Sequence, residues 1–304
     1  IDREKEINDF KPEEYWTIDA EFKKGRGKAF PASFYGLDGK KTKLPDNDAV
    51  QDVLGRVDKA QPFDVTSVVK KERKRFPAPP FTTSSLQQEA NRKLNFRTRK
   101  TMMLAQQLYE GINLGGKEGT VGLITYMRTD STRVSSVAKA ETSKFIHEEY
   151  GEPYAATKIR QGKLQEGAQD AHEAIRPSST YRTPKSLEKV LTKDQMRLYQ
   201  LIWSRFVASE MTPAVVDTVS VKLHQNGAEF RANGSHTKFK GFTTLYVSSR
   251  DADQKDRELP ELAEGDSVTL TKTDPAQHFT QPPARYSEAN LVKALEENGV
   301  GRPS

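Results

Sequence analysis

The sequence predicts a multi-domain α+β protein in which a helical domain is inserted into a β-rich domain. Apolar residues recur at helical spacing through a central block of roughly 130 residues, whereas strand-like alternation marks the stretches on both sides of it. The chain has 304 residues, of which 35% are hydrophobic and 30% are charged. That length accommodates two or three domains with cores of their own, and the high polarity suits an open, multi-lobed protein.

The first β-rich block begins with residues 14–22, which are rich in aromatic and β-branched side chains and predict a strand. Short strand candidates separated by Gly and Asp turns continue to Val69. A basic run at residues 70–75 follows, and the proline-rich residues 77–80 then form a stiff break. We assign residues 15–78 to the β-rich domain.

The helical block begins where Ser85 and Gln88 form a capping-box pattern ahead of apolar residues at helical spacing. A second helix is predicted from Thr98 to Tyr109, with Gly111 as its end. Three further segments carry helical patterns: residues 134–149, 185–191 and 193–210. The helical domain is accordingly predicted at residues 79–212.

Strand-like alternation returns after Ala214. Val219, Val221 and Leu223 alternate with polar residues, and similar patterns occur near residues 237–247 and 267–272. We assign residues 213–282 to the second part of the β-rich domain.

The two ends of the chain carry helical patterns. Residues 1–14 and 283–304 are predicted to be pieces of one further helical domain, and the last helix runs from Ser287 to Asn298. The chain begins at Ile1 without a methionine, and it stops shortly after the helix-terminating Gly299. We therefore expect an internal fragment of a longer protein.

Charge and composition narrow the classes of partner. The formal net charge is +6 and the isoelectric point is about 9.2, which favours anionic partners such as nucleic acid. The chain has no cysteine, which excludes disulfides, thiolate catalysis and cysteine-bound zinc. No apolar run approaches the roughly 20 residues that span a bilayer, and the start does not resemble a signal peptide. A soluble cytoplasmic protein without membrane contact is expected.

One segment nearly matches a nucleotide-binding loop. Residues 111–118 have the glycine spacing of a phosphate-binding loop, but Glu118 stands where a Ser or Thr would bind magnesium. A predicted helix, rather than a strand, precedes the segment. We expect no ATP binding.

Two other segments nearly match metal sites. Residues 172–176 resemble a zinc-protease helix, but Arg176 replaces the second ligand and arginine does not coordinate zinc. Asp251 and Asp253 could hold magnesium, but their hydrophilic surroundings favour an exposed turn. The sequence predicts no metal site in this chain.

A tyrosine in the middle of the chain stands in a segment suited to phosphoryl chemistry. The apolar run Val121–Met127 ends in Arg128, followed by Thr, Asp, Ser and Thr. In the simplest interpretation Tyr126 is a half-buried strand residue, and Asp130 or Ser131 caps the next helix. If the run is a strand, however, Tyr126 and Arg128 project from the same face. An arginine can bind phosphoryl oxygens with two hydrogen bonds and stabilise the charge of a phenol attacking phosphorus.

The segment Gly122–Thr132 resembles the active-site segment of bacterial type IA DNA topoisomerases. Five further stretches resemble the same family in the same order along the chain: Pro80–Gln88, Lys100–Glu110, Gln169–Pro177, His278–Glu288 and Gly299–Ser304. These stretches extend over the whole length, and their order and spacing are not a chance pattern.

The resemblance implies a fold and an activity. The two β-rich blocks would form the arch and hinge, and the helical insert would carry Tyr126. Tyr126 would attack a single-stranded segment of negatively supercoiled DNA, form a 5′-phosphotyrosine and release a 3′-hydroxyl. The other strand would pass through the gap before the reaction reverses, and no ATP would be consumed.

The resemblance also implies roles for individual residues. Arg128 would position the scissile phosphate. His172 matches a family histidine that contacts DNA, although the residues alone equally suggest a turn residue in a capping box formed by Asp170 and Glu173. Arg176 would either contact a phosphate or anchor the turn before Pro177. Three more residues are candidate DNA contacts: Gln88, Arg285 and Arg302.

The family's Mg²⁺ site lies in an acidic N-terminal domain with an Asp-x-Asp-x-x-Gly pattern. That pattern does not occur in these 304 residues. We expect the magnesium ligands, and the missing N-terminal and C-terminal domains, in the intact protein, which would act in the cytoplasm on the nucleoid. The 304 residues alone are expected to be inactive in DNA relaxation.

Two alternatives to a topoisomerase remain. A single-stranded DNA-binding module would use the basic runs and aromatic stacking. A tyrosine recombinase would use dispersed arginines and a tyrosine near its C-terminus, whereas Tyr126 is in the middle of this chain.

Overall fold

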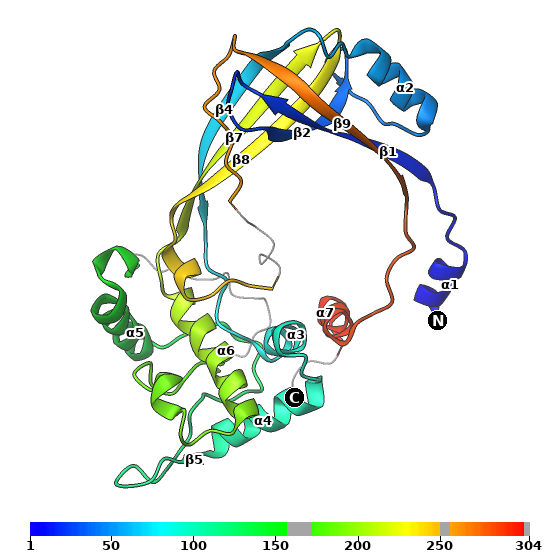
Figure 1. Cartoon of the computed structure of the whole chain (residues 1–304). Coiled ribbons are helices and arrows are strands. Elements are labelled where there is room, and N and C mark those ends of the chain that lie inside the picture. Colours follow the sequence, from blue (N-terminus) through cyan, green and yellow to red (C-terminus); the bar gives the residue numbers. More distant parts are fainter. Residues whose placement is uncertain (157–171, 250–255, 301–304) are drawn as a thin grey trace. The chain divides into compact units, whose positions relative to one another are not determined.

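The computed structural model describes residues 1–156, 172–249 and 256–300 (Figure 1). Its contacts divide the chain into two compact units. The sheet unit comprises residues 1–73, 215–238 and 255–285, and the helical unit comprises residues 74–214, 239–254 and 286–304. The predicted α+β class is confirmed, because a large antiparallel sheet and a group of helices are both present.

The sheet unit is built on seven strands in the order β1-β9-β4-β7-β8-β2-β3. β1 also pairs with β2, so the sheet closes on itself. The strands are β1 (Glu14–Lys23), β2 (Phe30–Leu37), β3 (Lys40–Lys41), β4 (Phe63–Arg75), β7 (Ala214–Gln225), β8 (Ala228–Phe239) and β9 (Ser267–Phe279).

Alternating residues of these strands fill the interior of the sheet unit. On β1, Ile18, Ala20 and Phe22 are buried while their neighbours face solvent, so the predicted strand at residues 14–22 is confirmed. Phe22 meets Phe63 edge to face at 5.0 Å and Phe230 at 5.7 Å. The closed sheet therefore has an aromatic core of its own.

The described residues of the sheet unit also form the helices α1 (Asp2–Asn8) and α2 (Asn47–Arg56). α1 buries none of its residues. The sequence does not predict α2, because short strands and turns are expected over this segment. Asp46 caps α2 by accepting a hydrogen bond from the Ala49 amide, and Val50 and Val53 pack into the sheet core.

The predicted strand near residues 237–247 is wrong beyond Phe239. β8 begins earlier, after a hairpin turn in which Asn226 and Gly227 both have positive φ, and it ends at Phe239. Beyond it the chain forms the 3₁₀ turn η3 (Gly241–Thr244). Gly241 has a φ of +48°, and its backbone lies against the Pro213 carbonyl, so the strand cannot continue there.

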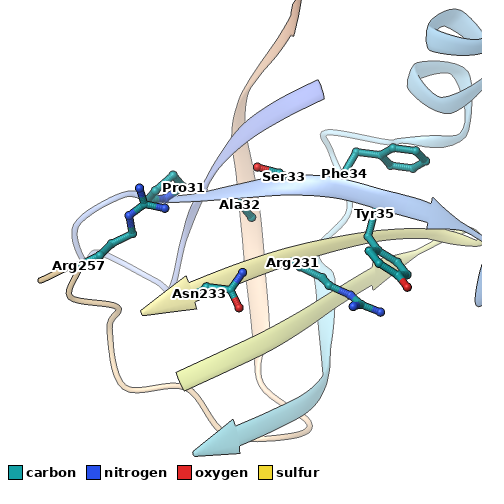
Figure 2. Close-up of a pocket in the computed structure, with 8 residues that line it drawn as sticks. All are labelled: Pro31, Ala32, Ser33, Phe34, Tyr35, Arg231, Asn233 and Arg257. Carbon is teal, nitrogen blue, oxygen red and sulfur yellow. The ribbon is translucent and has the colours of Figure 1, made fainter. Parts of the chain in front are cut away.

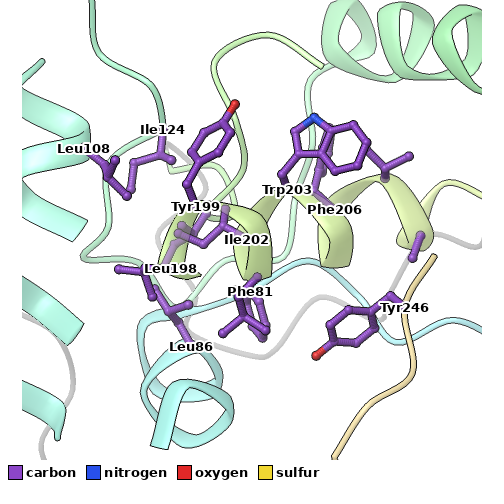
Figure 3. Close-up of a cluster of buried hydrophobic side chains, with 14 of the residues drawn as sticks. Phe81, Leu86, Leu108, Ile124, Leu198, Tyr199, Ile202, Trp203, Phe206 and Tyr246 are labelled. Carbon is purple, nitrogen blue, oxygen red and sulfur yellow. The ribbon is translucent and has the colours of Figure 1, made fainter. Parts of the chain in front are cut away.

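The helical unit packs around one long helix. Its elements are α3 (Thr83–Leu94), α4 (Thr98–Glu110), the two-stranded pair β5 (Ile112–Asn113) and β6 (Thr120–Val121), α5 (Ser136–Tyr150), η1 (Glu152–Tyr154), η2 (Lys185–Leu187), α6 (Lys193–Ser209), η3 and α7 (Glu288–Glu297). α6 contributes Leu198, Ile202 and Phe206 to the core, where Leu86 of α3 and Leu108 of α4 meet them (Figure 3).

The helix predictions hold in part. The α4 segment and its end at Gly111 are confirmed. The capping box of α3 lies one turn earlier than predicted, because Thr82 and Ser85 form it and Ser85 is already the third helical residue. Of the helix predicted at residues 185–191, only the 3₁₀ turn η2 forms.

The last helix joins the helical unit. α7 packs on α3, whereas α1 groups with the sheet unit. A shared further domain for residues 1–14 and 283–304 stays a prediction. No helix in the described ranges has the length and apolar character that crossing a membrane requires.

Candidate active site

Tyr126 lies in an irregular segment that follows β6. The predicted strand at residues 121–127 is wrong beyond Val121, the last residue of β6, because Ile124 forms only an isolated bridge, with Pro177. The Leu123 amide instead donates to the Leu108 carbonyl at 2.7 Å, and the Thr125 amide donates to the Arg176 carbonyl at 2.9 Å. The loop is held by α4 and by residues 174–178, so strand alternation does not set the direction of Tyr126 and Arg128.

Buried neighbours on both sides fix the Tyr126 loop. Leu123, Ile124 and Met127 are each no more than 3% exposed, whereas Tyr126 is 41% exposed. The buried hydroxyl of Thr83 donates to the Met127 carbonyl at 2.7 Å and accepts the Thr129 amide at 2.8 Å. The start of α3 thus holds the loop while the phenol of Tyr126 faces solvent.

Two rings flank Tyr126. The Tyr109 ring of α4 meets it edge to face at 5.3 Å, and the His172 ring lies 6.2 Å from it. Arg128, two residues further on, is exposed. Gly122 allows the loop to pass α4 closely, because a Cβ there would lie 2.7 Å from the Tyr109 carbonyl oxygen. Tyr109 is not among the predicted site residues, although it lies in the stretch Lys100–Glu110 that resembles the family.

The segment that carries His172 is tied to the Tyr126 loop. The Thr125 hydroxyl donates to the Ala174 carbonyl at 2.7 Å, and the Ala174 amide donates to the Arg133 carbonyl at 2.8 Å. Residues 172–174 are not helical, and Asp170 of the predicted capping box lies outside the described residues. His172 is half-buried beside Tyr126.

Arg176 points its guanidinium into its own turn. Both Nε and Nη2 donate to Glu173, at 2.9 and 2.6 Å, and Nη1 donates to the Pro177 carbonyl at 2.9 Å. Its side chain is only 14% exposed. These contacts match the anchoring interpretation of Arg176 rather than that of a phosphate contact.

A family model described as DNA topoisomerase matches residues 1–304. The chain belongs to the DNA topoisomerase family. It is also similar to the structure of full-length topoisomerase I from Thermotoga maritima, with a TM-score of 0.81 and 36% sequence identity. The match covers 99% of this chain and 47% of that one, so the chain spans about half the length of that relative. The predicted type IA topoisomerase core fold is thereby confirmed.

Two of the other candidate DNA contacts, Gln88 and Arg285, have partners within the chain. Gln88 is buried on α3, where its amide donates to Ser84 at 3.1 Å and to Glu296 at 3.4 Å. Arg285 belongs to the sheet unit and forms an exposed ion pair with Glu4 at 2.8 Å. Arg302 lies outside the described residues.

The segment that nearly matched a phosphate-binding loop forms the β5–β6 turn. α4 precedes it, and Glu118 pairs with Arg182 at 3.3 Å. A strand–loop–helix arrangement, which a phosphate-binding loop requires, does not occur at this place. Asp251 and Asp253 lie outside the described residues. Among the residues that are described, no group of three or more histidine, aspartate or glutamate side chains is placed to hold a metal ion.

An open pocket on the sheet unit contains none of the predicted site residues. It lies over β2 and β8 (Figure 2), and Arg231 and Arg257 are the cations in its lining. The Arg231 guanidinium stacks 3.1 Å from the centre of the Tyr35 ring and pairs with Glu229 at 2.6 Å. The charge of Arg231 is therefore already compensated by Glu229.

Proposed function

We propose that this chain is the strand-cleaving core of a type IA DNA topoisomerase and that Tyr126 is its nucleophile. One observation carries the proposal. Tyr126 is an exposed tyrosine on a loop whose flanking residues are buried, with His172 beside its ring and Arg128 exposed two residues away. A phenol fixed in this way, beside an imidazole ring and two residues from a guanidinium, suits attack on a phosphodiester.

The proposed reaction is a reversible transesterification. The Tyr126 oxygen attacks phosphorus in a single-stranded segment of negatively supercoiled DNA, so that an O–P bond to tyrosine forms while the P–O3′ bond breaks. The phenol gives up its proton, and the leaving 3′ oxygen takes one up. The 5′-phosphotyrosine retains the bond energy, so the 3′-hydroxyl reverses the step after strand passage without ATP.

Three side chains would assist Tyr126. Arg128 would bind the non-bridging oxygens of the scissile phosphate and stabilise the charge that develops on them. His172 would contact the DNA strand next to the phenol. Arg176 would hold the turn that carries His172, because its guanidinium is already bound to Glu173.

The family resemblance implies Mg²⁺ in the intact enzyme. The described residues offer no cluster that fits the ion, and we derive no step through it. Single-stranded DNA would be the substrate, and the N-terminal and C-terminal domains would complete the enzyme in the cytoplasm, on the nucleoid.

Covalent trapping on end-labelled oligonucleotides tests this proposal in the full topoisomerase that contains the chain. A 5′-phosphotyrosine attaches the protein to the downstream fragment, so a 3′-labelled strand should give a labelled protein. A 5′-labelled strand should release a free labelled fragment. Labelled protein from the 5′-labelled strand would indicate recombinase chemistry instead, and binding without any adduct would indicate a single-stranded DNA-binding module.

Substitutions identify the residues. Tyr126→Phe should abolish the adduct, whereas Tyr109→Phe, which leaves the neighbouring ring in place, should retain it. Arg128→Ala should slow cleavage by roughly 100-fold, the loss typical for removal of one charge-stabilising donor. Adduct formation by Tyr126→Phe would disprove the assignment of the nucleophile.

A further inference from the structure

One face of α3 carries a row of polar side chains. Ser84, Gln88 and Arg92 are spaced four residues apart and therefore lie on one face of the helix. The row is linked internally, because Gln88 donates to Ser84 at 3.1 Å and accepts from Arg92 at 3.4 Å. These side chains present hydroxyl, amide and guanidinium donors, the groups that bind phosphate oxygens.

α7 packs on α3 (Figure 1), and one of its carboxylates already occupies this row. Glu296 Oε2 accepts a hydrogen bond from the Ser84 hydroxyl at 2.7 Å and lies 3.4 Å from the Gln88 amide nitrogen. At the other end of the row, Asn290 of α7 accepts from Arg92 at 3.4 Å. The donors of α3 thus hold an anionic group supplied by the chain itself.

A second carboxylate of α7 binds the start of α4. The Thr98 amide donates to Glu288 at 2.5 Å, and Arg97, the N-cap residue, makes no capping hydrogen bond of its own. Hydrogen bonding from the Thr98 side chain, and then from its amide, holds the pKa of Glu288 below its ordinary value. Glu288 and Glu296 are separated by about 12 Å along the helix, at 1.5 Å per residue, so two distinct anion positions lie beneath α7.

Little apolar surface holds α7 in place. Ala289 is its only buried residue among those described, and Leu291 and Leu295 remain 46% and 39% exposed. The docking of α7 therefore depends mainly on polar contacts, which water or another anion can replace.

We propose that Ser84, Gln88, Arg92 and the Thr98 amide form a phosphodiester-binding strip and that α7 occupies this strip through Glu296 and Glu288. A single DNA strand and α7 then compete for the same donors. The strip is a second DNA-contacting surface next to the Tyr126 loop, since α3 also holds that loop through Thr83. The identity of the ligand as DNA rests on the proposed function.

Fluorescence anisotropy with a labelled oligodeoxythymidine tests the competition in the full chain carrying Tyr126→Phe, which prevents cleavage. Glu296→Gln should tighten binding by about tenfold, because it removes one charged competitor from the strip. Glu297→Gln removes the same charge from the next residue of α7, which pairs with Lys293 rather than with α3, and should change affinity less than twofold. Arg92→Ala added to Glu296→Gln should cancel the gain.

Amide hydrogen exchange gives a second measurement, because a general change in net charge would not alter the exchange rates of α7. The amides of α7 should exchange faster when the oligonucleotide is bound, since bound DNA displaces the helix. Equal affinities for Glu296→Gln and Glu297→Gln, or unchanged protection of α7, would overturn the strip while leaving the assignment of Tyr126 intact. Failure of every variant to bind at low salt would overturn both proposals.

Discussion

Two buried carboxylates of the helical unit have pKa values that are shifted in opposite directions. Glu89 accepts hydrogen bonds from the Tyr246 hydroxyl and from the amide and hydroxyl of Ser249, each at 2.8 Å. Burial would raise the pKa of Glu89, but these hydrogen bonds outweigh it and hold the pKa below its ordinary value. Glu210 is equally buried, and its Oε2 has no hydrogen-bond partner among the described residues. Burial raises the pKa of Glu210, and Lys139 only partly opposes this.

These environments predict opposite effects of pH. Because the pKa of Glu210 is raised in the folded protein, ionisation of this carboxyl destabilises the fold. The destabilisation is absent below the ordinary pKa near 4.5 and is complete above the folded pKa. Glu210→Gln should therefore stabilise the protein by about 1–3 kcal/mol at neutral pH, and thermal melts should show the gain vanish below pH 4.5.

Glu89→Gln serves as the matched comparison. Because the pKa of Glu89 is lowered in the folded protein, its ionised carboxylate stabilises the fold above the ordinary pKa near 4.5. This stabilisation is lost as the pH falls through the folded pKa. The substitution should destabilise at neutral pH. Equal changes in melting temperature for Glu210→Gln and Glu89→Gln would contradict the opposite pKa shifts of the two carboxylates.

Among the elements, the loop of Tyr126 depends most on one side chain from elsewhere. Thr83 is buried and bonds the loop at both Met127 and Thr129. Thr83→Val keeps the shape but leaves the Thr129 amide without its acceptor, so it should cost roughly 1–3 kcal/mol of stability. DNA cleavage should slow as the loop loosens, as adduct formation over time would show. Thr83→Ser retains the hydroxyl and should behave like the wild type; if it is equally impaired, the hydroxyl is not the cause.

The sequence predicts best the elements that have local signals. Gly111 indicates the end of α4, and the aromatic and β-branched side chains of residues 14–22 indicate β1. The apolar run of the Tyr126 segment predicts a strand that does not form, because apolar residues report burial and not backbone conformation. Leu123, Ile124 and Met127 are indeed buried, but α4 and residues 174–178 supply the hydrogen bonds. The contacts of Tyr126 with Tyr109 and His172 join distant parts of the chain, and only the tertiary fold creates them.

At the scale of the whole chain, each unit has its own hydrophobic core and one of the two tryptophans. Trp16 packs on the core of the sheet unit, and Trp203 is buried in that of the helical unit. Phe230→Ala should destabilise the sheet unit by about 3–5 kcal/mol, the usual cost of a buried phenylalanine. Thermal unfolding followed through Trp16, in a Trp203→Phe background, should shift to lower temperature.

Unfolding followed through Trp203, in a Trp16→Phe background, should stay nearly unchanged. Equal shifts of both signals would mean that the two units unfold as one cooperative structure.

The pairing of β1 with β9 joins Glu14 to Phe279 and continues along both strands. During synthesis, β1 leaves the ribosome well before its partner β9. Residues 74–214, which form most of the helical unit, emerge in between and can fold while one edge of β1 is still unpaired. β1 can pair with β2 early, but its other edge stays open until β9 is made and must not pair with other unpaired strands before then.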